Sequence, residues 1–197
     1  MTASMQRLLT FSRAVDRINR FVGRAMVWPL LASVFISAGN AVSRKFFSLS
    51  SNAWIEAQWH LFAVAFLGCA GYVLLVDEHV RVDALSSRWS ARTRAAIDAV
   101  VLVLAAVPMT LLFATHGWSV FVHAWRSGET SFNAGGLAVW PIYLCIPLGM
   151  ALLGLQAVSE LIRRIAFLQG HVERANLREE DLPPMVGAAA VGGGSTR

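Results

Sequence analysis

AVVLVLAAVPMTLLFATHGWSVFVHAW, the sequence from Ala99 to Trp125, is 27 residues long and contains no Asp, Glu, Lys or Arg. Three further stretches share this property: Ala25 to Ser43 with 19 residues, Ala57 to Val76 with 20 and Thr130 to Ser159 with 30. An α-helix rises about 1.5 Å per residue, so about 20 apolar residues cross the hydrocarbon core of a bilayer, which is about 30 Å thick. A helix also satisfies its own backbone hydrogen bonds, which lipid cannot do. The sequence therefore predicts an all-α integral membrane protein with four transmembrane helices, at about residues 25–43, 55–76, 98–123 and 140–162.

The composition agrees with a membrane protein, because 56% of the residues are hydrophobic and only 15% are charged. The charged residues lie between and outside the four stretches, and none of these segments is large enough to bury a core of its own. We therefore expect one membrane domain, residues 25–165, preceded by a basic segment (1–24) and followed by a tail (166–197). The last residues of this tail, PPMVGAAAVGGGSTR from Pro183, are rich in glycine and small residues, which is typical of a disordered end.

The basic residues predict the orientation of the chain. Cytoplasmic segments close to span ends accumulate Lys and Arg, and here fourteen of the seventeen basic residues lie before the first span, between the second and third, or after the fourth. The opposite side receives only Arg44, Lys45 and Arg126. Both termini are therefore expected in the cytoplasm. A pI of about 10.2 would also suit a nucleic-acid-binding protein, but basic residues that flank hydrophobic spans indicate contact with anionic lipid instead.

The first 24 residues have the pattern of an amphipathic helix. In a helix, Leu8, Phe11, Val15, Ile18 and Val22 would share one stripe, and Arg13, Arg17, Arg20 and Arg24 would lie opposite. This pattern predicts an interfacial helix that lies on the membrane surface and remains as an anchor. A disordered basic tail whose arginines only set the topology is the alternative.

Polar residues near the outer end of the second span are the first candidates for a site. The span is expected to start near Asn52, with Glu56 in its first turn, where the helix dipole favours an acid. Trp54 and Trp59 would lie at the level of the outer headgroups, as interfacial tryptophans do. Pro108 is expected to kink the third span, and Gly68, Gly71, Gly149 and Gly154 are expected at close helix approaches.

Three histidines form a second constellation. His60 lies at the outer end of the second span, and His116 and His123, seven residues apart, share one face of the third. Imidazoles from two helices in the same leaflet can ligate a haem. One interpretation of these histidines is therefore that the protein is a haem-binding membrane anchor of a redox complex. Interfacial histidines that bind water or headgroups are the other. Cys69 and Cys145 are isolated, and neither belongs to a metal or redox motif.

Three segments resemble one transporter family. They are SNAWIEAQWHLFAVAFLGCAGY (Ser51 to Tyr72), EHVRVDALSSR (Glu78 to Arg88) and VWPIYLCIPLGMALLGLQAVSELIRRI (Val139 to Ile165). Their order resembles that in the small permease subunit of tripartite ATP-independent periplasmic (TRAP) transporters, the DctQ-type family. Three elements carry the resemblance: the Trp-x-Glu entrance to the second span (Trp54 and Glu56), the His-Val-Arg-Val-Asp segment (His79 to Asp83) and the Pro-Leu-Gly turn (Pro147 to Gly149). The resemblance covers about residues 25–165.

The resemblance implies a function without catalysis. The chain would be the scaffold subunit of a sodium-coupled importer in the bacterial inner membrane, beside a large DctM-type permease subunit that carries the transport sites. A periplasmic DctP-type binding protein would deliver a carboxylate-bearing solute. No catalytic, cofactor or metal residue is expected. The residues expected at the interface with a partner are Trp54, Glu56, Trp59, Arg81 and Asp83.

Arg81 and Asp83 allow two interpretations of their role. Alternate charges just inside the cytoplasmic boundary can fix a loop to a partner through charge-assisted hydrogen bonds. Alternatively, Arg81 only contributes to the topology and Asp83 caps a short helix. A transporter that works alone is disfavoured, because it would need acids at the membrane midplane. The stretches Ala57 to Val76, Ala99 to Trp125 and Thr130 to Ser159 contain none.

Overall fold

The structure is a computed structural model and describes residues 3–48, 51–76, 89–133 and 136–171. Its helices are α1 (Ala3–Ala25), α2 (Val27–Phe47), α3 (Asn52–Leu75), α5 (Ala91–Val101), the π-helical segment η1 (Leu102–Ala106), α6 (Val107–Ser127) and α7 (Trp140–Leu168). Within these ranges the only β-type pairing is an isolated bridge between Thr130 and Ala138. The predicted disordered end and the candidates Arg81 and Asp83 lie outside the described residues.

In the described part of the chain, four continuous helices are long and apolar enough to cross a membrane: Ser4–Phe47, Asn52–Leu75, Ala91–Ser127 and Trp140–Leu168. Between 11% and 28% of the most apolar window of each helix is buried inside the molecule. The apolar side chains therefore face outward, as the hydrocarbon around a membrane protein requires. The predicted all-α fold with four spans is confirmed.

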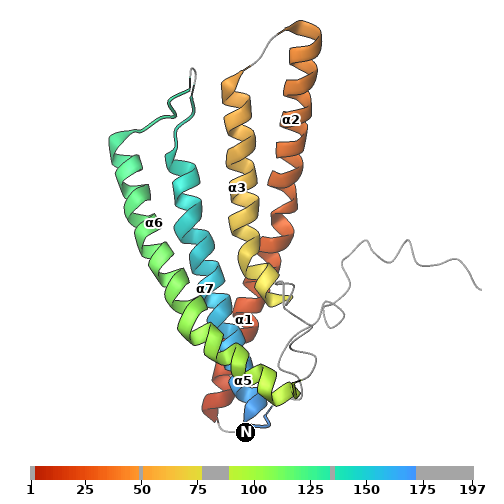
Figure 1. Ribbon diagram of the computed structural model, residues 1–197, viewed down its shortest axis with the longest axis vertical. Coiled ribbons are helices and arrows are strands. Elements are labelled where there is room, and N and C mark those ends of the chain that lie inside the picture. Colours follow the sequence, from red (N-terminus) through yellow and green to blue (C-terminus); the bar gives the residue numbers. More distant parts are fainter. Residues whose placement is uncertain (1–2, 49–50, 77–88, 134–135, 172–197) are drawn as a thin grey trace, which may run out of the picture.

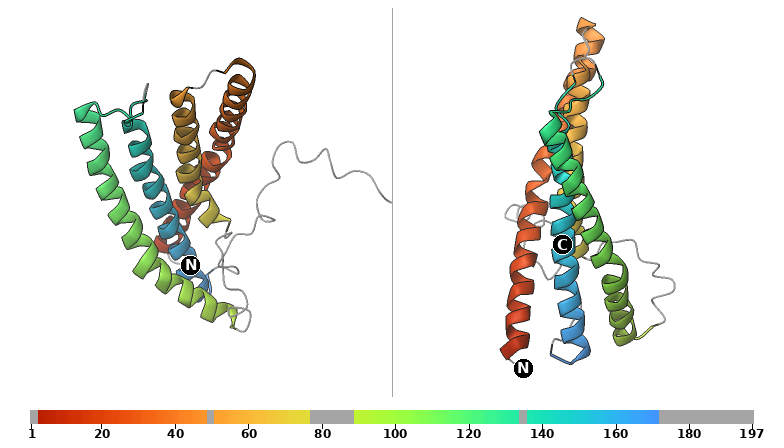
Figure 2. Two further views of the ribbon diagram at one scale, coloured as in Figure 1. Left: turned by 45° about the horizontal axis from the view of Figure 1, so that its top comes forward. Right: turned by 90° about the vertical axis from the view of Figure 1, so that its left-hand side faces the viewer.

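Helix α7 is the centre of the bundle. Helices α6, α7, α3 and α2 stand side by side in that order (Figure 1), and α7 also contacts α1 and α5 at its other end. Figure 2 shows the same order after the molecule is turned. We call the end with the α6–α7 connection, residues 129–139, the loop end, and the end with α1 and α5 the network end.

Helix α1 is almost continuous with α2. Met26, between the two, keeps a helical backbone, and its N–H donates to the Val22 carbonyl at 3.0 Å. Helix α1 packs against α7 and α3, so it has a buried face in addition to the apolar and basic faces expected from the sequence. Its position relative to a membrane surface stays a prediction, as do the domain boundaries.

The glycines predicted at close helix approaches do lie there. A Cβ added to Gly149 on α7 would come within 2.8 Å of the Leu67 carbonyl oxygen on α3, and one on Gly154 within 2.9 Å of the Thr110 hydroxyl on α6. Gly68 lies against Met26, and Gly71 lies against Asn19. These contacts leave no room for a larger side chain, which allows the helix backbones to approach.

The start of α3 differs from the expectation. The helix begins at Asn52, Ser51 occupies the N-cap position, and no acid lies in the first turn. The prediction that Glu56 lies in the first turn is therefore wrong. Glu56 lies one turn further along, where its carboxylate contacts the connection between α6 and α7 instead of the end of its own helix.

The third long helix contains a π-helical segment directly before Pro108. The Val107 N–H donates to the Leu102 carbonyl, five residues back, and Pro108 has no N–H with which to continue the regular pattern. The helix bends along this region (Figure 2), as proline and π-segments both cause.

Candidate functional site

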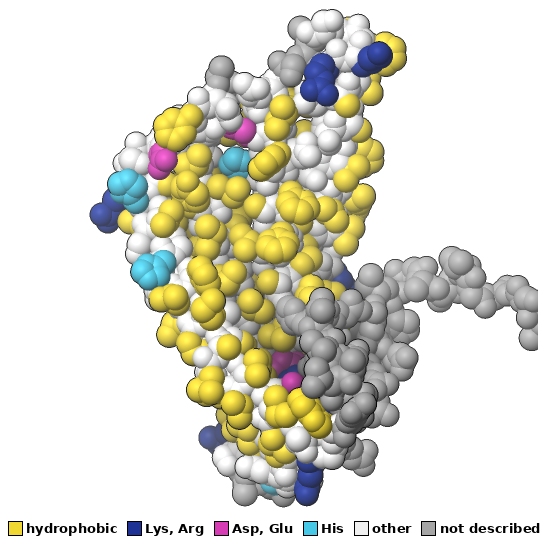
Figure 3. All heavy atoms as spheres, viewed as in Figure 1, with side chains coloured by type: hydrophobic (Ala, Val, Ile, Leu, Met, Phe, Trp, Pro, Cys, Tyr) yellow, Lys and Arg dark blue, Asp and Glu magenta, His cyan; other side chains and the backbone are white. Residues whose placement is uncertain are grey.

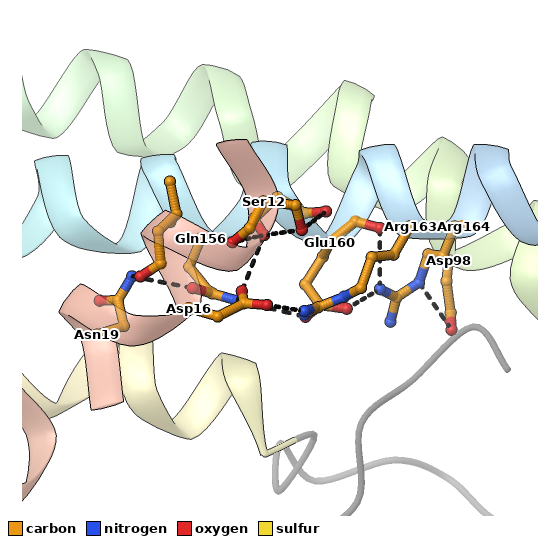
Figure 4. Close-up of polar contacts among 10 residues, drawn as sticks. Ser12, Asp16, Asn19, Asp98, Gln156, Glu160, Arg163 and Arg164 are labelled. Carbon is orange, nitrogen blue, oxygen red and sulfur yellow. Dashed lines mark hydrogen bonds and ion pairs between the residues drawn. The ribbon is translucent and has the colours of Figure 1, made fainter. Parts of the chain in front are cut away.

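Polar side chains fill the contact between α1 and α7 at the network end. Each helix contributes residues at helical spacing, so they form one stripe along the contact (Figure 4). All are buried, with at most 7% of their surface exposed. They are Ser12, Asp16 and Asn19 on α1, and Gln156, Ser159, Glu160, Arg163 and Arg164 on α7.

Asp16 is the hub of this network. Its carboxylate accepts hydrogen bonds from Gln156 Nε2 and Ser159 Oγ, both at 2.9 Å, and pairs with Arg163. Gln156 uses its amide oxygen to accept from Asn19 Nδ2, also at 2.9 Å. One α1 carboxylate thus fixes three α7 side chains, and buried polar groups satisfied in this way specify a single packing of the two helices.

The charged members form a chain of alternating sign. Asp16 pairs with Arg163, Arg163 with Glu160, and Glu160 with Arg164. Arg164 Nε then lies 3.4 Å from Asp98 Oδ2 on α5. The chain of ion pairs therefore crosses from α1 over α7 to α5, and each charge has a neighbour of opposite sign. We call these five residues, Asp16, Arg163, Glu160, Arg164 and Asp98, the charge chain.

The energetics of such a chain favour a structural role. Taking ions out of water costs several kcal/mol each, which mutual attraction repays only when every partner is in place. Loss of one partner leaves a buried charge uncompensated, at a cost of about 3–5 kcal/mol. The charge chain therefore favours one relative position of α1 and α7 strongly, and it adds a weaker contact to α5, where the Asp98 side chain is 28% exposed.

A second polar cluster lies at the loop end. The Glu56 carboxylate accepts from Asn133 Nδ2 at 2.6 Å, from the Leu137 N–H at 2.7 Å and from the Ser131 hydroxyl. The loop itself is closed by the Ser131 N–H, which donates to the Leu137 carbonyl at 2.9 Å. Glu56 thus ties the α6–α7 connection to the beginning of α3.

The sequence was compared with known proteins. The family model of the DctQ component of tripartite ATP-independent periplasmic transporters matches residues 17–167. The chain belongs to the DctQ family. No curated protein sequence and no solved structure matches it. DctQ is a transporter family and not an enzyme family, so this chain is a multi-pass membrane component of a TRAP transporter.

The family match covers all of the α7 residues of the polar network but only part of its α1 residues. It includes every α7 member, from Gln156 to Arg164, and it begins one residue after Asp16. Ser12 and Asp16, which complete the network from α1, lie before it. The contacts that Ser12 and Asp16 make with α7 therefore come from a segment outside the match, whereas the contact between Asn19 and Gln156 lies inside it.

The interface candidates of this DctQ component separate into three groups. Glu56 has its carboxylate used within the chain by the α6–α7 connection. Trp54 and Trp59 lie on α3 with 51% and 68% of their surface exposed, so both are available to lipid or a partner. Arg81 and Asp83 are among the residues that the structure does not describe.

The three histidines are distributed over two helices that α7 separates (Figure 1). His60 on α3 has its Nδ1 2.7 Å from the Glu56 carbonyl, whereas His116 and His123 are exposed on α6. The structure does not bring the pair on α6 together with His60 as a haem-binding site requires. Among the described residues, no group of three His, Cys, Asp or Glu side chains is arranged to hold a metal ion.

Sequence reasoning missed the polar network of this DctQ chain. Arg163 and Arg164 were assigned only to the topology, although they are buried. A signal was present: Ser12, Asp16 and Asn19 are four and three residues apart, which places them on one helix face that is neither the apolar nor the basic one. A second polar face of this kind, between the apolar and basic faces of an amphipathic helix, indicates a buried partner.

Proposed function

We propose that this chain is the small scaffold subunit of a TRAP-type importer in the bacterial inner membrane. In this proposal it packs beside a large DctM-type permease subunit, and a periplasmic DctP-type binding protein delivers the solute. Uptake is coupled to sodium, and the solute carries a carboxylate. Both termini of the chain lie in the cytoplasm.

The observation that carries the scaffold role is the charge chain. Its carboxylates and guanidinium groups bind one another across α1, α7 and α5, so they connect helices. A sodium or substrate site needs ligands that can exchange a bound ion for water or for each other during transport. Ion pairs that fix three helices in one arrangement suit a rigid support for a moving subunit.

The arrangement of the helices supports the proposed orientation. The N-terminal end of α1 and the C-terminal end of α7 both lie at the network end (Figure 1), as four crossings require. Most basic residues are found near that end or in the segments next to it. Only Arg44, Lys45 and Arg126 lie toward the opposite end.

Co-purification tests the proposed partnership. The chain, tagged at one terminus, is expressed together with a large DctM-type permease subunit from the same genome and is extracted in mild detergent. We expect the two subunits to elute together in equal amounts. A chain that elutes without the large subunit, while it remains folded and monodisperse, would contradict the proposal.

Sodium coupling provides a separate test of the scaffold role. Glu56→Gln removes a carboxylate that the loop already uses, so the number of sodium ions per solute in reconstituted vesicles should stay the same even if the rate falls. Glu129→Gln, in the same connection, is the control for the loss of one negative charge at this end. A changed sodium-to-solute ratio in the Glu56 variant alone would mean that this subunit takes part in coupling.

A further inference from the structure

Helix α6 carries a polar stripe on the face that points away from the bundle. The residues buried toward α7 are Thr110, Gly117 and Ala124. At about 100° per residue, the stripe lies on the opposite side of the helix. All five of its members are exposed: Thr115, His116, Ser119, His123 and Arg126. Figure 3 shows histidine and basic side chains at this free edge of the molecule.

The hydrogen-bonding capacity of the stripe is only partly used. The Thr115 hydroxyl donates to the Leu111 and Leu112 carbonyls at 3.0 and 2.9 Å, and the Ser119 hydroxyl donates to the Thr115 carbonyl at 3.3 Å. Both hydroxyl oxygens can still accept a hydrogen bond. Within the described residues, the imidazoles of His116 and His123 and the Arg126 guanidinium have no hydrogen-bond or ion-pair partner.

The stripe extends into the depth of the membrane. Thr115 and Arg126 are eleven residues apart, so they are separated by about 16 Å along the helix axis. This is about half the thickness of the hydrocarbon core. If Arg126 lies at the headgroups, then Thr115, His116 and Ser119 lie within the hydrocarbon. Lipid tails offer these groups no hydrogen bonds, and polar side chains at such depth normally face protein.

We propose that the α6 stripe is the surface on which a transmembrane helix of the large permease subunit docks. The docking helix presents hydrogen-bond acceptors to His116 and His123 and a carboxylate to Arg126. The inference rests on the proposed function and adds to it the face through which the two subunits meet.

A second copy of this chain fits the stripe poorly. Two copies in one membrane have the same orientation, so a symmetric pair would bring each residue of the stripe close to its own counterpart. Arg126 would then face Arg126, and two like charges at a membrane boundary repel each other. A chemically different helix avoids this conflict and supplies the acceptors that the stripe lacks.

Site-specific photocrosslinking tests the docking face in the complete transporter. A benzoylphenylalanine is placed at Ser119 or, as a control, at Phe35 on α2, which lies at the other edge of the row of helices and is 74% exposed. We expect a crosslink between position 119 and the large subunit, and none from position 35. A crosslink from position 35 without one from position 119, or an adduct of two copies of this chain, would overturn the proposal.

A substitution series measures the contribution of the stripe to binding. His116→Leu, Ser119→Ala and His123→Leu are combined, which removes two imidazoles and one hydroxyl from the stripe without adding bulk. Interhelical hydrogen bonds in membranes are individually modest, so we expect the triple variant to retain the large subunit about tenfold less well. The matched control combines Leu31→Ala, Phe35→Ala and Val42→Ala, exposed residues of α2, and should retain it normally.

The two tests separate failure of this inference from failure of the proposed function. If the unmodified subunits do not co-purify at all, the partnership itself is wrong. If they co-purify and the triple variant binds as tightly as the unmodified chain, the docking face is wrong and the partnership stands. Crosslinking leaves the other stripe residues intact, so it decides the question even if the triple variant fails to fold.

Discussion

At the scale of single residues, Asp16 is the side chain that connects α1 to α7 most extensively within the polar network. Its carboxylate binds Gln156, Ser159 and Arg163 on α7. Asp16→Asn keeps the shape and removes the charge, which leaves Arg163 with Glu160 as its remaining partner. Breaking a buried pair in this way costs about 3 kcal/mol or more, so we expect a clearly lower thermal midpoint in detergent.

Arg13→Gln is the control for the Asp16 variant. Arg13 is exposed on the same helix, and exposed substitutions usually change stability by less than about 0.5 kcal/mol. Combining Asp16→Asn with Arg163→Gln should recover part of the loss, because the guanidinium group that has lost its Asp16 partner is then removed as well. Equal melting of the Asp16 and Arg13 variants would show that the network does not stabilise the bundle.

Glycine contacts give a second prediction at this scale. Gly149→Ala would place a methyl group 2.8 Å from the backbone oxygen of Leu67, and backbone cannot move aside as a side chain can. We expect a loss of about 1–3 kcal/mol, seen as a lower midpoint in thermal unfolding. Gly39→Ala is the matched control, since the nearest atom to its new Cβ is 3.6 Å away on Trp54. A Gly149 variant as stable as the Gly39 variant would mean that α3 and α7 are not packed this closely.

At the scale of elements, the Glu56 cluster predicts a local effect. Glu56→Gln replaces a carboxylate that accepts three hydrogen bonds from the α6–α7 connection, and charge-assisted bonds are the stronger kind. We expect hydrogen exchange of the Leu137 amide to become about tenfold faster, because its N–H loses a charged acceptor. Exchange within α7 should not change. With Glu129→Gln, the Leu137 amide should keep its original rate, and equal acceleration in both variants would argue against the anchoring role.

The sequence predicts the elements well and the contacts between them poorly. The four spans could be identified because runs without charge are long and end at charged residues. The close approaches of glycines such as Gly149 and Gly154 could be identified because small residues have few other uses in apolar helices. The polar network between α1 and α7 could not be identified in this way, because helical spacing shows that a helix has a polar face but not which helix that face contacts. The contacts of Glu56 could not be predicted for a similar reason, since its donors Ser131 and Leu137 are 75 and 81 residues away.

At the scale of the whole molecule, the topology is directly testable. Reporter fusions after Lys45 and after Ser127 should report a periplasmic location, and fusions after Arg88 and after Gln169 a cytoplasmic one. The distribution of basic residues gives this orientation. Cytoplasmic activity after Ser127 would be incompatible with four spans in the proposed order.

The central claim is that this chain supports transport without performing it. The most direct measurement is sodium-driven solute uptake into proteoliposomes that contain this chain alone, the large subunit alone, or both, each with the binding protein outside. We expect uptake only when both membrane subunits are present. Uptake by this chain alone, at a rate similar to that of the complex, would contradict it.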